Sequence, residues 1–421
     1  MNEKLLQYLW NYKIFTHFNF QDVEGVSIEV LDFGKWNHDA GPDFYLAKIR
    51  IGNITLVGNI ELHVKTSDWN HHHHENNSDF DNLILHVVYE NDQEIVSLKN
   101  KNITTLELKN YISLPTLSRY QQLNENNKFI PCENIFDVQK IPFHFAEESV
   151  LNKLQEKSWE IKKSLVQYKN DYEAVLFHYL AYNFGLSINA EIFKEIAESI
   201  DFKVIQKIRN NNLQLEVLLF GYSGWLENPQ DENMKKWKSE FEFLQSKFNI
   251  QKKKYSPKFL RLRPQNFPTI RFSQLANLYH QHQNVFSKLV QAKNIQEIFT
   301  ILNEIQASEY WNTHFNFGKI STQDYPKKLS KDFIHSIIIN TILPFKYSYQ
   351  KFINEEAHDE IIEMYKQISA EKNTIISEWK NIGFQASNSL ESQAFLYHYK
   401  HFCVQKKCLN CGICFKLLKD E

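Results

Sequence analysis

The chain has 421 residues, a length that exceeds the usual size of one domain and favours two or three. Hydrophobic residues make up 43% and charged residues 23% of it, a balance typical of folded globular proteins, which excludes a mostly disordered chain. The formal net charge is −2, so any surface that binds nucleic acid would have to be local.

No stretch approaches the roughly 20 apolar residues that a membrane-spanning helix needs. The N-terminus also lacks the basic start and the small-residue cleavage site of a signal peptide. We therefore expect a cytoplasmic protein with no membrane partner.

The first 110 residues or so carry a short helix followed by strands. Leu5, Leu6, Leu9 and Trp10 recur at helical spacing and predict an amphipathic helix over Glu3–Phe15. Runs rich in Val, Ile, Leu and Phe, separated by Gly- and Asn-rich turns, predict strands at Ser27–Phe33, Phe44–Ile51, Ile54–Val64, Leu83–Tyr89, Glu94–Leu98 and Thr104–Leu108.

Beyond about Pro142 the pattern is helical as far as Tyr399. Apolar residues recur every three or four positions in segments such as Phe145–Val166, Tyr172–Phe184, Leu213–Leu226 and Phe333–Leu343. We expect an α+β protein in three parts. These are a small mixed-sheet unit over residues 1–135, a helical body over 136–400 and a cysteine-rich, metal-binding tail over 401–421 packed on that body.

The densest group of ionisable residues lies in the N-terminal strands. Asp43 follows a Gly-Pro turn at the start of one strand. In the next strand, the alternation of side chains places Glu61, His63 and Lys65 on one face and apolar residues on the other. A purely structural strand has little reason to gather three ionisable groups on one face, so we interpret them as a candidate site.

Histidines follow directly in the sequence. His72 and His74 are candidates for general acid–base chemistry near neutral pH, whereas we expect His71 and His73 to be exposed loop residues. His86 lies within an apolar strand and is interpreted as a core histidine. Carboxylates combined with imidazoles are the ligands and proton carriers of hydrolysis assisted by a divalent metal.

The Pro-Asp turn followed by a Glu-x-basic strand resembles the PD-(D/E)xK superfamily of restriction-endonuclease-like nucleases. This resemblance implies a restriction-endonuclease-like sheet on which Asp43 and Glu61 bind Mg²⁺ or Mn²⁺ against the scissile phosphate of a nucleic acid. His63 stands where the superfamily has a lysine, and Lys65 would substitute for it within reach. The connection after Lys65 is short, and we expect little room there for the helix that this fold usually inserts.

Two further likenesses concern longer patterns. Trp69, His72 and His74 form a Trp-x-x-His-x-His pattern similar to that of the mismatch-nicking members of the same superfamily, whose histidines serve the chemistry. Five motifs and the cysteine tail identify the chain as a member of DUF2851, a bacterial family of unknown function. The motifs are Ala-Gly-Pro-Asp-Phe, Gly-x-(Ile/Val)-Glu-(Ile/Leu)-His, Ser-Asp-Trp-x-x-His-x-His, Leu-His-Val-Val and Leu-Arg-Pro-x-Asn-x-Pro-x-x-Arg.

Three of the six arginines of the chain fall within eleven positions. Arg261, Arg263 and Arg271 flank a proline-rich turn that contains Asn266. Guanidinium groups suit phosphate oxygens, so one interpretation is a phosphate clamp that binds the substrate, formed by these four residues. The alternative is an inter-domain staple in which the arginines pair with carboxylates.

The cysteines predict a second metal site. Thiolates at knuckle spacing are typical of zinc sites, and iron–sulfur proteins use similar spacings. Likeness to the iron–sulfur staple of certain helicase-nucleases implies that an upstream cysteine completes the set. The sequence leaves open zinc or a [4Fe–4S] cluster, and Cys132 or Cys414 as the fourth ligand beside Cys403, Cys408 and Cys411.

The leading functional hypothesis is a metal-dependent nuclease or phosphodiesterase centred on Asp43 and Glu61, with nucleic acid as its partner. The first alternative is a non-catalytic, nuclease-like module that binds nucleic acid or protein. A third hypothesis is hydrolysis of a small phosphorylated or amide substrate at a histidine-rich zinc site.

Overall fold

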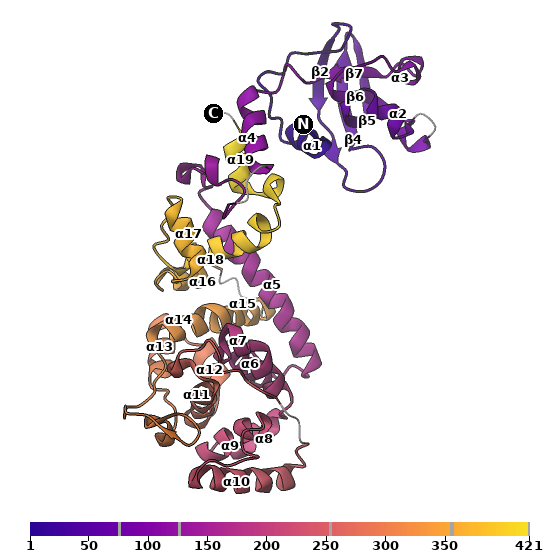
Figure 1. The fold of residues 1–421 in the computed structure, drawn as a ribbon. Helices are drawn as coiled ribbons and strands as arrows, with labels where there is room; N and C mark the ends of the chain where they lie inside the picture. Colours follow the sequence, from indigo (N-terminus) through magenta and orange to yellow (C-terminus); the bar gives the residue numbers. More distant parts are fainter. Residues whose placement is uncertain (75–76, 125–127, 252–254, 354–357, 420–421) are drawn as a thin grey trace. The chain divides into compact units, whose positions relative to one another are not determined.

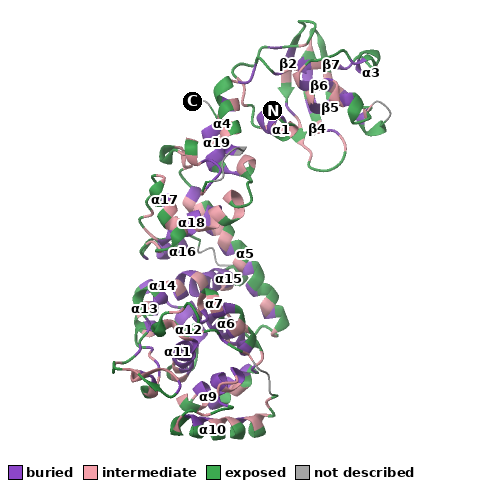
Figure 2. Ribbon diagram, viewed as in Figure 1, coloured by how far each residue is buried: buried purple, intermediate pink, exposed green. Residues whose placement is uncertain are grey.

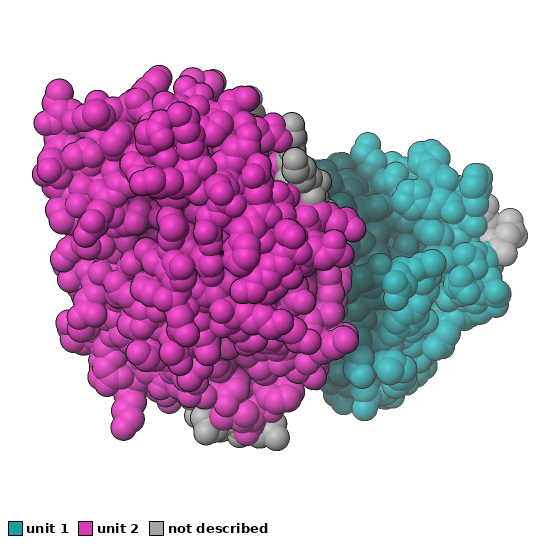
Figure 3. All heavy atoms as spheres, turned by 90° about the horizontal axis from the view of Figure 1, so that it is seen from below, with its two compact units in different colours: residues 1–145, 377–384, 398–421 teal, residues 146–376, 385–397 magenta. Residues whose placement is uncertain are grey.

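The structure is a computed structural model that describes residues 1–74, 77–124, 128–251, 255–353 and 358–419. It is an α+β protein with a mixed sheet in its N-terminal part and helices after it (Figure 1). The chain divides into two compact units, coloured separately in Figure 3. Unit 1 comprises residues 1–145, 377–384 and 398–421, and unit 2 comprises residues 146–376 and 385–397.

Unit 1 is built on a sheet with strand order β1-β2-β4-β5-β6-β7, to which β3 adds by pairing with β4. The strands β2, β4 and β5 are antiparallel neighbours, whereas β5, β6 and β7 run parallel. Helix α1 (Glu3–Asn11) packs against β5. The strands are β1 (Phe20–Gln21), β2 (Ser27–Asp32), β3 (Lys35–Trp36), β4 (Phe44–Ile51), β5 (Ile54–Lys65), β6 (Leu83–Glu90) and β7 (Thr104–Glu107).

The connection from β5 to β6 contains one short helical turn, in keeping with the little room that the sequence leaves there. Because β5 and β6 are parallel, the chain must cross from one end of the sheet to the other between them. Helix α2 (Asp68–His71) and the 3₁₀ turn η2 (Ser78–Phe80) lie in this crossover. A single helical turn fits the short connection where a longer helix would not.

Two expected elements of the N-terminal part differ in the structure. The first helix ends at Asn11 rather than at Phe15, because the chain turns at Tyr12 and Lys13, where Lys13 has a φ of 55°. The expected strand Glu94–Leu98 is instead helix α3 (Val96–Asn100). The other expected strands are present, each ending within two residues of its predicted bounds.

The C-terminal end of the chain belongs to unit 1. The hydroxyl of Thr116 donates to the carbonyl of Leu418 at 3.2 Å, and Nη1 of Arg119 donates to the carbonyl of Leu417 at 3.4 Å. These bonds join the last helix to α4. The elements concerned are α4 (Leu114–Asn124), η3 (Glu133–Ile135), η4 (Val138–Lys140), the π-helical turn η8 (Tyr399–Cys403), η9 (Cys408–Asn410) and α19 (Gly412–Leu418).

Over its described residues, the regular structure of unit 2 is helical apart from the hairpin β8 (His314–Asn316) and β9 (Lys319–Ile320). Its buried residues gather along the helix faces that meet one another (Figure 2). The helices are α5 (Phe145–Gln167), α6 (Tyr172–Phe184), α7 (Leu186–Glu198), α8 (Phe202–Ile208), α9 (Asn212–Tyr222), α10 (Glu232–Phe248), η5 (Pro264–Asn266), α11 (Pro268–Gln281), α12 (Val285–Val290), α13 (Ile295–Asn303), η6 (Glu309–Asn312), α14 (Lys331–Ile337), η7 (Ile338–Ile342), α15 (Leu343–Phe352), α16 (His358–Lys366) and α18 (Ser389–His398).

Helix α17 (Thr374–Asn381) lies where the chain passes from unit 2 to unit 1. Within the described residues, no helix combines the length and the apolar character that crossing a membrane requires. The division of the chain into parts over 1–135, 136–400 and 401–421 stays a prediction.

Candidate metal and catalytic site

Asp43 and Glu61 lie next to each other where the start of β4 pairs with β5. The backbone N–H of Asp43 donates to Oε2 of Glu61 at 3.0 Å, and the N–H of Leu62 donates to Oδ2 of Asp43 at 2.9 Å. These two bonds arise because Asp43 immediately precedes β4, whose first residue, Phe44, is in register with Ile60 of β5. The fold therefore brings together two carboxyl groups that are 18 positions apart in the sequence.

Both carboxyl groups are largely enclosed by protein, which makes their negative charges costly. Burial raises the pKa of Asp43 well above its usual range, and the neighbouring charge of Glu61 raises it further. Burial likewise raises the pKa of Glu61, to which the charge of Glu3 also contributes. A pair of buried carboxylates of like charge is a setting that a bound cation would stabilise.

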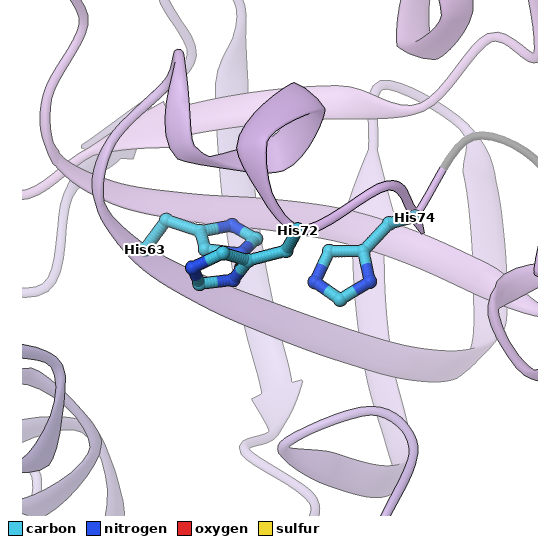
Figure 4. A group of neighbouring side chains, drawn as sticks. All are labelled: His63, His72 and His74. Carbon is cyan, nitrogen blue, oxygen red and sulfur yellow. The ribbon is translucent and has the colours of Figure 1, made fainter.

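Three imidazoles lie beside Glu61. One ring nitrogen from each of His63, His72 and His74 falls within 4.8 Å of the others, and the three rings face a common space (Figure 4). Oε1 of Glu61 lies 3.4 Å from Nε2 of His74 and 3.8 Å from Nε2 of His63. His63 comes from β5, and His72 and His74 follow α2, so the crossover supplies two of the three rings.

A fourth imidazole supports this group from behind. Nδ1 of His63 lies 2.9 Å from Nε2 of His86, which β6 holds in the core, and Nε2 of His63 lies 3.2 Å from Nδ1 of His72. Burial lowers the pKa of His63 to about 2 and that of His86 to about 3. Both rings are therefore neutral at physiological pH and carry one nitrogen lone pair each, as a metal ligand requires.

The structure separates Lys65 from this group. Lys65 ends β5, is exposed, and is in register with Glu90 at the end of β6. The pKa of Glu90 is lowered mainly by a hydrogen bond from Lys109, and the charge of Lys65 adds to this effect. Lys65 thus lies among carboxylates at the end of the sheet. His71 and His73 are exposed, as expected.

Helix α1 contributes two residues that the sequence interpretation missed. Nε2 of Gln7 donates to Oδ1 of Asp43 at 2.7 Å. Glu3, one helical turn earlier, lies close enough to His72 and His74 for their charges to act on its carboxyl group, whose pKa burial raises. The spacing of Glu3 and Gln7 by four positions places them on one helix face, but which face of the helix meets the sheet is a matter of tertiary packing.

The arginine segment lies in unit 2 and is not extended. Arg261 has a φ of 64° in a turn, so it does not alternate with Arg263 as an extended chain would require. Both are exposed, and neither forms an ion pair with a carboxylate within the described ranges. Arg271 is buried and donates to Asn266 Oδ1 at 2.6 Å and to Gln274 Oε1 at 2.9 Å.

Arg271 is therefore held by amides rather than by carboxylates. Its guanidinium carbon also lies 3.6 Å from the ring centroid of Phe333, and burial lowers its pKa to about 9. Within the described residues, the ion pairs that a carboxylate staple would need are not formed at these arginines. A role of Arg261 and Arg263 in binding phosphate stays a prediction.

All five cysteines line one cavity in unit 1, together with Trp379, His398 and Phe402. The thiols are reduced, and Nε2 of His398 lies 3.2 Å from Sγ of Cys411. Burial raises the pKa of the Cys132 thiol to about 12, and the nearby thiols of Cys411 and Cys408 raise it further. The fold thus brings Cys132 to the C-terminal cysteines, although it lies 271 positions before Cys403 in the sequence.

One family model matches the chain. It is described as a protein of unknown function (DUF2851) and covers residues 3–374, which include the sheet, the imidazole group and the arginine segment. The match ends before Cys403. No curated protein and no solved structure matches the chain.

Proposed function

The chain belongs to the DUF2851 family, whose description assigns no activity, and we propose from its site that it is a metal-dependent phosphodiesterase that cleaves nucleic acid. One observation carries this proposal. Glu61 lies between Asp43 on one side and the imidazoles of His63 and His74 on the other, so carboxylate and imidazole ligands meet at one group.

The donor set suits some divalent ions better than others. Mg²⁺ prefers oxygen ligands, whereas imidazole nitrogen beside carboxylate oxygen suits Mn²⁺ or Zn²⁺. We expect Glu61, His63 and His74 to hold such an ion, with Asp43 close enough to complete or to orient the set. A divalent ion at this position supplies an acidified water molecule and neutralises the charge of a phosphate group.

The surrounding side chains have separate tasks. His72 is the exposed member of the imidazole group and so the one that substrate and solvent reach, which suits a general base or acid. Gln7 fixes the carboxylate of Asp43, and His86 fixes the ring of His63.

The order of the elements also favours a nuclease. The resemblance to PD-(D/E)xK nucleases implies an aspartate and a glutamate on adjacent strands, followed by a helix in the next connection. Asp43 immediately precedes β4, Glu61 lies on the neighbouring strand β5, and the short helix α2 follows. His63 stands in place of the usual lysine, so the imidazoles would stabilise the negative charge on the phosphate instead of that lysine.

The test is cleavage of labelled single- and double-stranded DNA and RNA in the presence of Mn²⁺. Wild-type protein should cleave at least one of these substrates. The Glu61→Gln variant keeps the size of the side chain and an acceptor for the Asp43 N–H but loses the charge, so we expect a loss of at least about 100-fold.

Glu29→Gln is the matched control, because Glu29 lies on β2 and pairs with Arg50 at the surface of the same sheet. Its cleavage rate should equal that of the wild type. Equal loss in both variants, or no loss in Glu61→Gln, would contradict the assignment of the site. Binding of nucleic acid by the wild type without any cleavage would favour the non-catalytic binding module instead.

The imidazole group supports a second candidate, hydrolysis of a small phosphorylated or amide substrate with zinc. Three imidazoles around one space are a ligand set that zinc enzymes use, with a fourth position open for water. Stoichiometric Zn²⁺ that is lost in a His63→Ala variant, with turnover of a small phosphodiester but not of nucleic acid, would favour this candidate.

A further inference from the structure

The cysteine cavity is a second site, separate from the imidazole group. Its thiols come from three segments of unit 1, since Cys132 precedes η3, Cys403 ends η8, and the others lie in or beside η9 and α19. They all line one cavity, and disulfide bonds do not link them. A hydrophobic core does not require five free thiols around one cavity, so we interpret them as ligands.

The separation of the thiols argues against a single zinc ion. A zinc–sulfur bond is about 2.3 Å long, so tetrahedral geometry requires sulfur atoms roughly 3.8 Å apart. Among the described residues, three ligand atoms come within 4.8 Å of one another at His63, His72 and His74, but no three of the five thiols do so. In this arrangement the thiols are too far apart to bind a single zinc ion together.

We propose that this cavity binds an iron–sulfur cluster, held by Cys132, Cys403, Cys408 and Cys411. A cluster of iron and sulfide is wider than a single ion, and it takes four cysteine thiolates as ligands. The spacing Cys403-x4-Cys408-x2-Cys411, completed by a distant cysteine, is also one that iron–sulfur proteins use.

Cys414 lines the same cavity as the other four, but it lies within helix α19. Its backbone N–H donates to Sγ of Cys411 at 3.3 Å, so the residue already serves a neighbouring sulfur through its main chain. Its thiol is 1% exposed and lies in α19 among the buried Ile413, Leu417 and Leu418. We assign Cys414 to the layer around the ligands, together with His398, whose ring contacts the sulfur of Cys411.

Such a cluster would join two parts of unit 1 that are far apart in sequence. It would tie the segment around Cys132 to η8, η9 and α19. Thr116 and Arg119 of α4 already donate hydrogen bonds to carbonyls in the last turn of α19. Because the cluster binds the folded arrangement of four ligands and not the unfolded chain, it would stabilise unit 1.

The first experiment is metal and sulfide analysis of the full chain purified without oxygen. We expect iron and acid-labile sulfide in equal amounts, about two or about four of each per chain according to the cluster type, with a broad visible absorption. One zinc per chain without iron would overturn the proposal, as would a chain that holds neither metal.

Variants then test the ligands. Cys132→Ser and Cys411→Ser should each lose at least about nine-tenths of the iron, whereas Cys414→Ser should keep it. Since a variant could fail to fold, each is also treated with Fe²⁺ and sulfide after its far-ultraviolet circular dichroism has been matched to that of the wild type. A folded Cys132→Ser that binds a full cluster, or a folded Cys414→Ser that binds none, would overturn the ligand assignment.

Discussion

The ring of His63 lies between two other imidazoles, and the proton on each ring decides what the group can bind. If Nδ1 of His63 donates to Nε2 of His86, then Nε2 of His63 presents a lone pair toward His72, His74 and Glu61. In this tautomer Nε2 of His86 accepts, and the proton of His86 lies on its buried Nδ1, which has no hydrogen-bond partner in the described structure. His86 is thus a positioning residue for a metal ligand.

We predict that His86→Phe lowers the affinity for Mn²⁺ by about 10- to 100-fold, because the phenyl ring fills the space but accepts no hydrogen bond. His86→Gln offers an acceptor near the former Nε2 and should recover part of the affinity. Calorimetric titration of Mn²⁺ measures both. His71→Ala is the control, since the side chain of His71 is 73% exposed and should not matter. An unchanged affinity in His86→Phe would show that His63 needs no such support.

At the scale of single residues, the sequence indicates well which residue types form the site. It indicates less well which residues the fold brings beside them. Asp43, Glu61 and the histidines after Trp69 stand out because acids and imidazoles are dense there. Gln7 and Glu3 do not, since an amphipathic helix with a polar face is ordinary, and only the packing of α1 on β5 brings that face to the site. Strand alternation also placed Lys65 on the face of Glu61, but the strand ends there.

Among the elements, α3 is the one whose type the sequence misassigned, and its burial pattern shows why. Ile95 and Leu98 are buried three positions apart and join a core cluster with Trp69, Phe80, Leu83 and Ile103. A strand would have turned residues 96 and 98 to the same side, yet Val96 is 68% exposed while Leu98 is 2% exposed. In so short a segment, the apolar positions expected of an alternating strand overlap with those expected of a helix, so the pattern does not distinguish the two.

This difference gives a prediction for the element. Leu98→Ala should destabilise unit 1 by about 2–5 kcal/mol, because it leaves a cavity in that core cluster. Val96→Ala, two positions away, should change stability by less than about 0.5 kcal/mol, because the side chain is at the surface. Urea unfolding of both variants measures this. Equal losses would contradict the helical assignment of α3.

Longer elements were easier to predict than short ones. The bounds of β4 and α6 equal the predicted Phe44–Ile51 and Tyr172–Phe184, because each carries enough periodic apolar residues to fix its type. The predicted helix Phe333–Leu343 is the middle of a longer run from α14 through the π-helical turn η7 to α15. Apolar periodicity identifies such a run but not the point at which Pro344 changes its hydrogen bonding.

On the scale of the whole molecule, each unit has a core of its own. Unit 2 also holds a largely buried carboxyl group, that of Glu173, which lies outside both candidate metal sites. Oε1 of Glu173 accepts from the N–H of Phe286 at 3.0 Å, while Oε2 is buried without a partner in the described structure. Burial raises the pKa of Glu173 from 4.5 to about 7. Between these values the folded protein keeps a proton that the unfolded chain has lost, so stability falls as pH rises through this window.

We predict that the melting temperature of unit 2 falls between pH 5 and pH 8 in the wild type and falls less in Glu173→Gln, which should melt about 2–4 °C higher at pH 8. The transition of unit 2 is the one that Mn²⁺ does not shift. Glu232→Gln is the control, because the side chain of Glu232 is 80% exposed. A variant with the full wild-type slope would contradict the assignment.

His178 gives the experiment its internal check, because its effect has the opposite sign. Burial lowers the pKa of His178 from 6.5 to about 4, so the unfolded chain binds the extra proton between these values and stability rises with pH there. Above pH 6.5 this rise is complete. A fall in melting temperature that continues from pH 6.5 to 7.5, and that Glu173→Gln removes, therefore belongs to the carboxyl group of Glu173 and not to the imidazole.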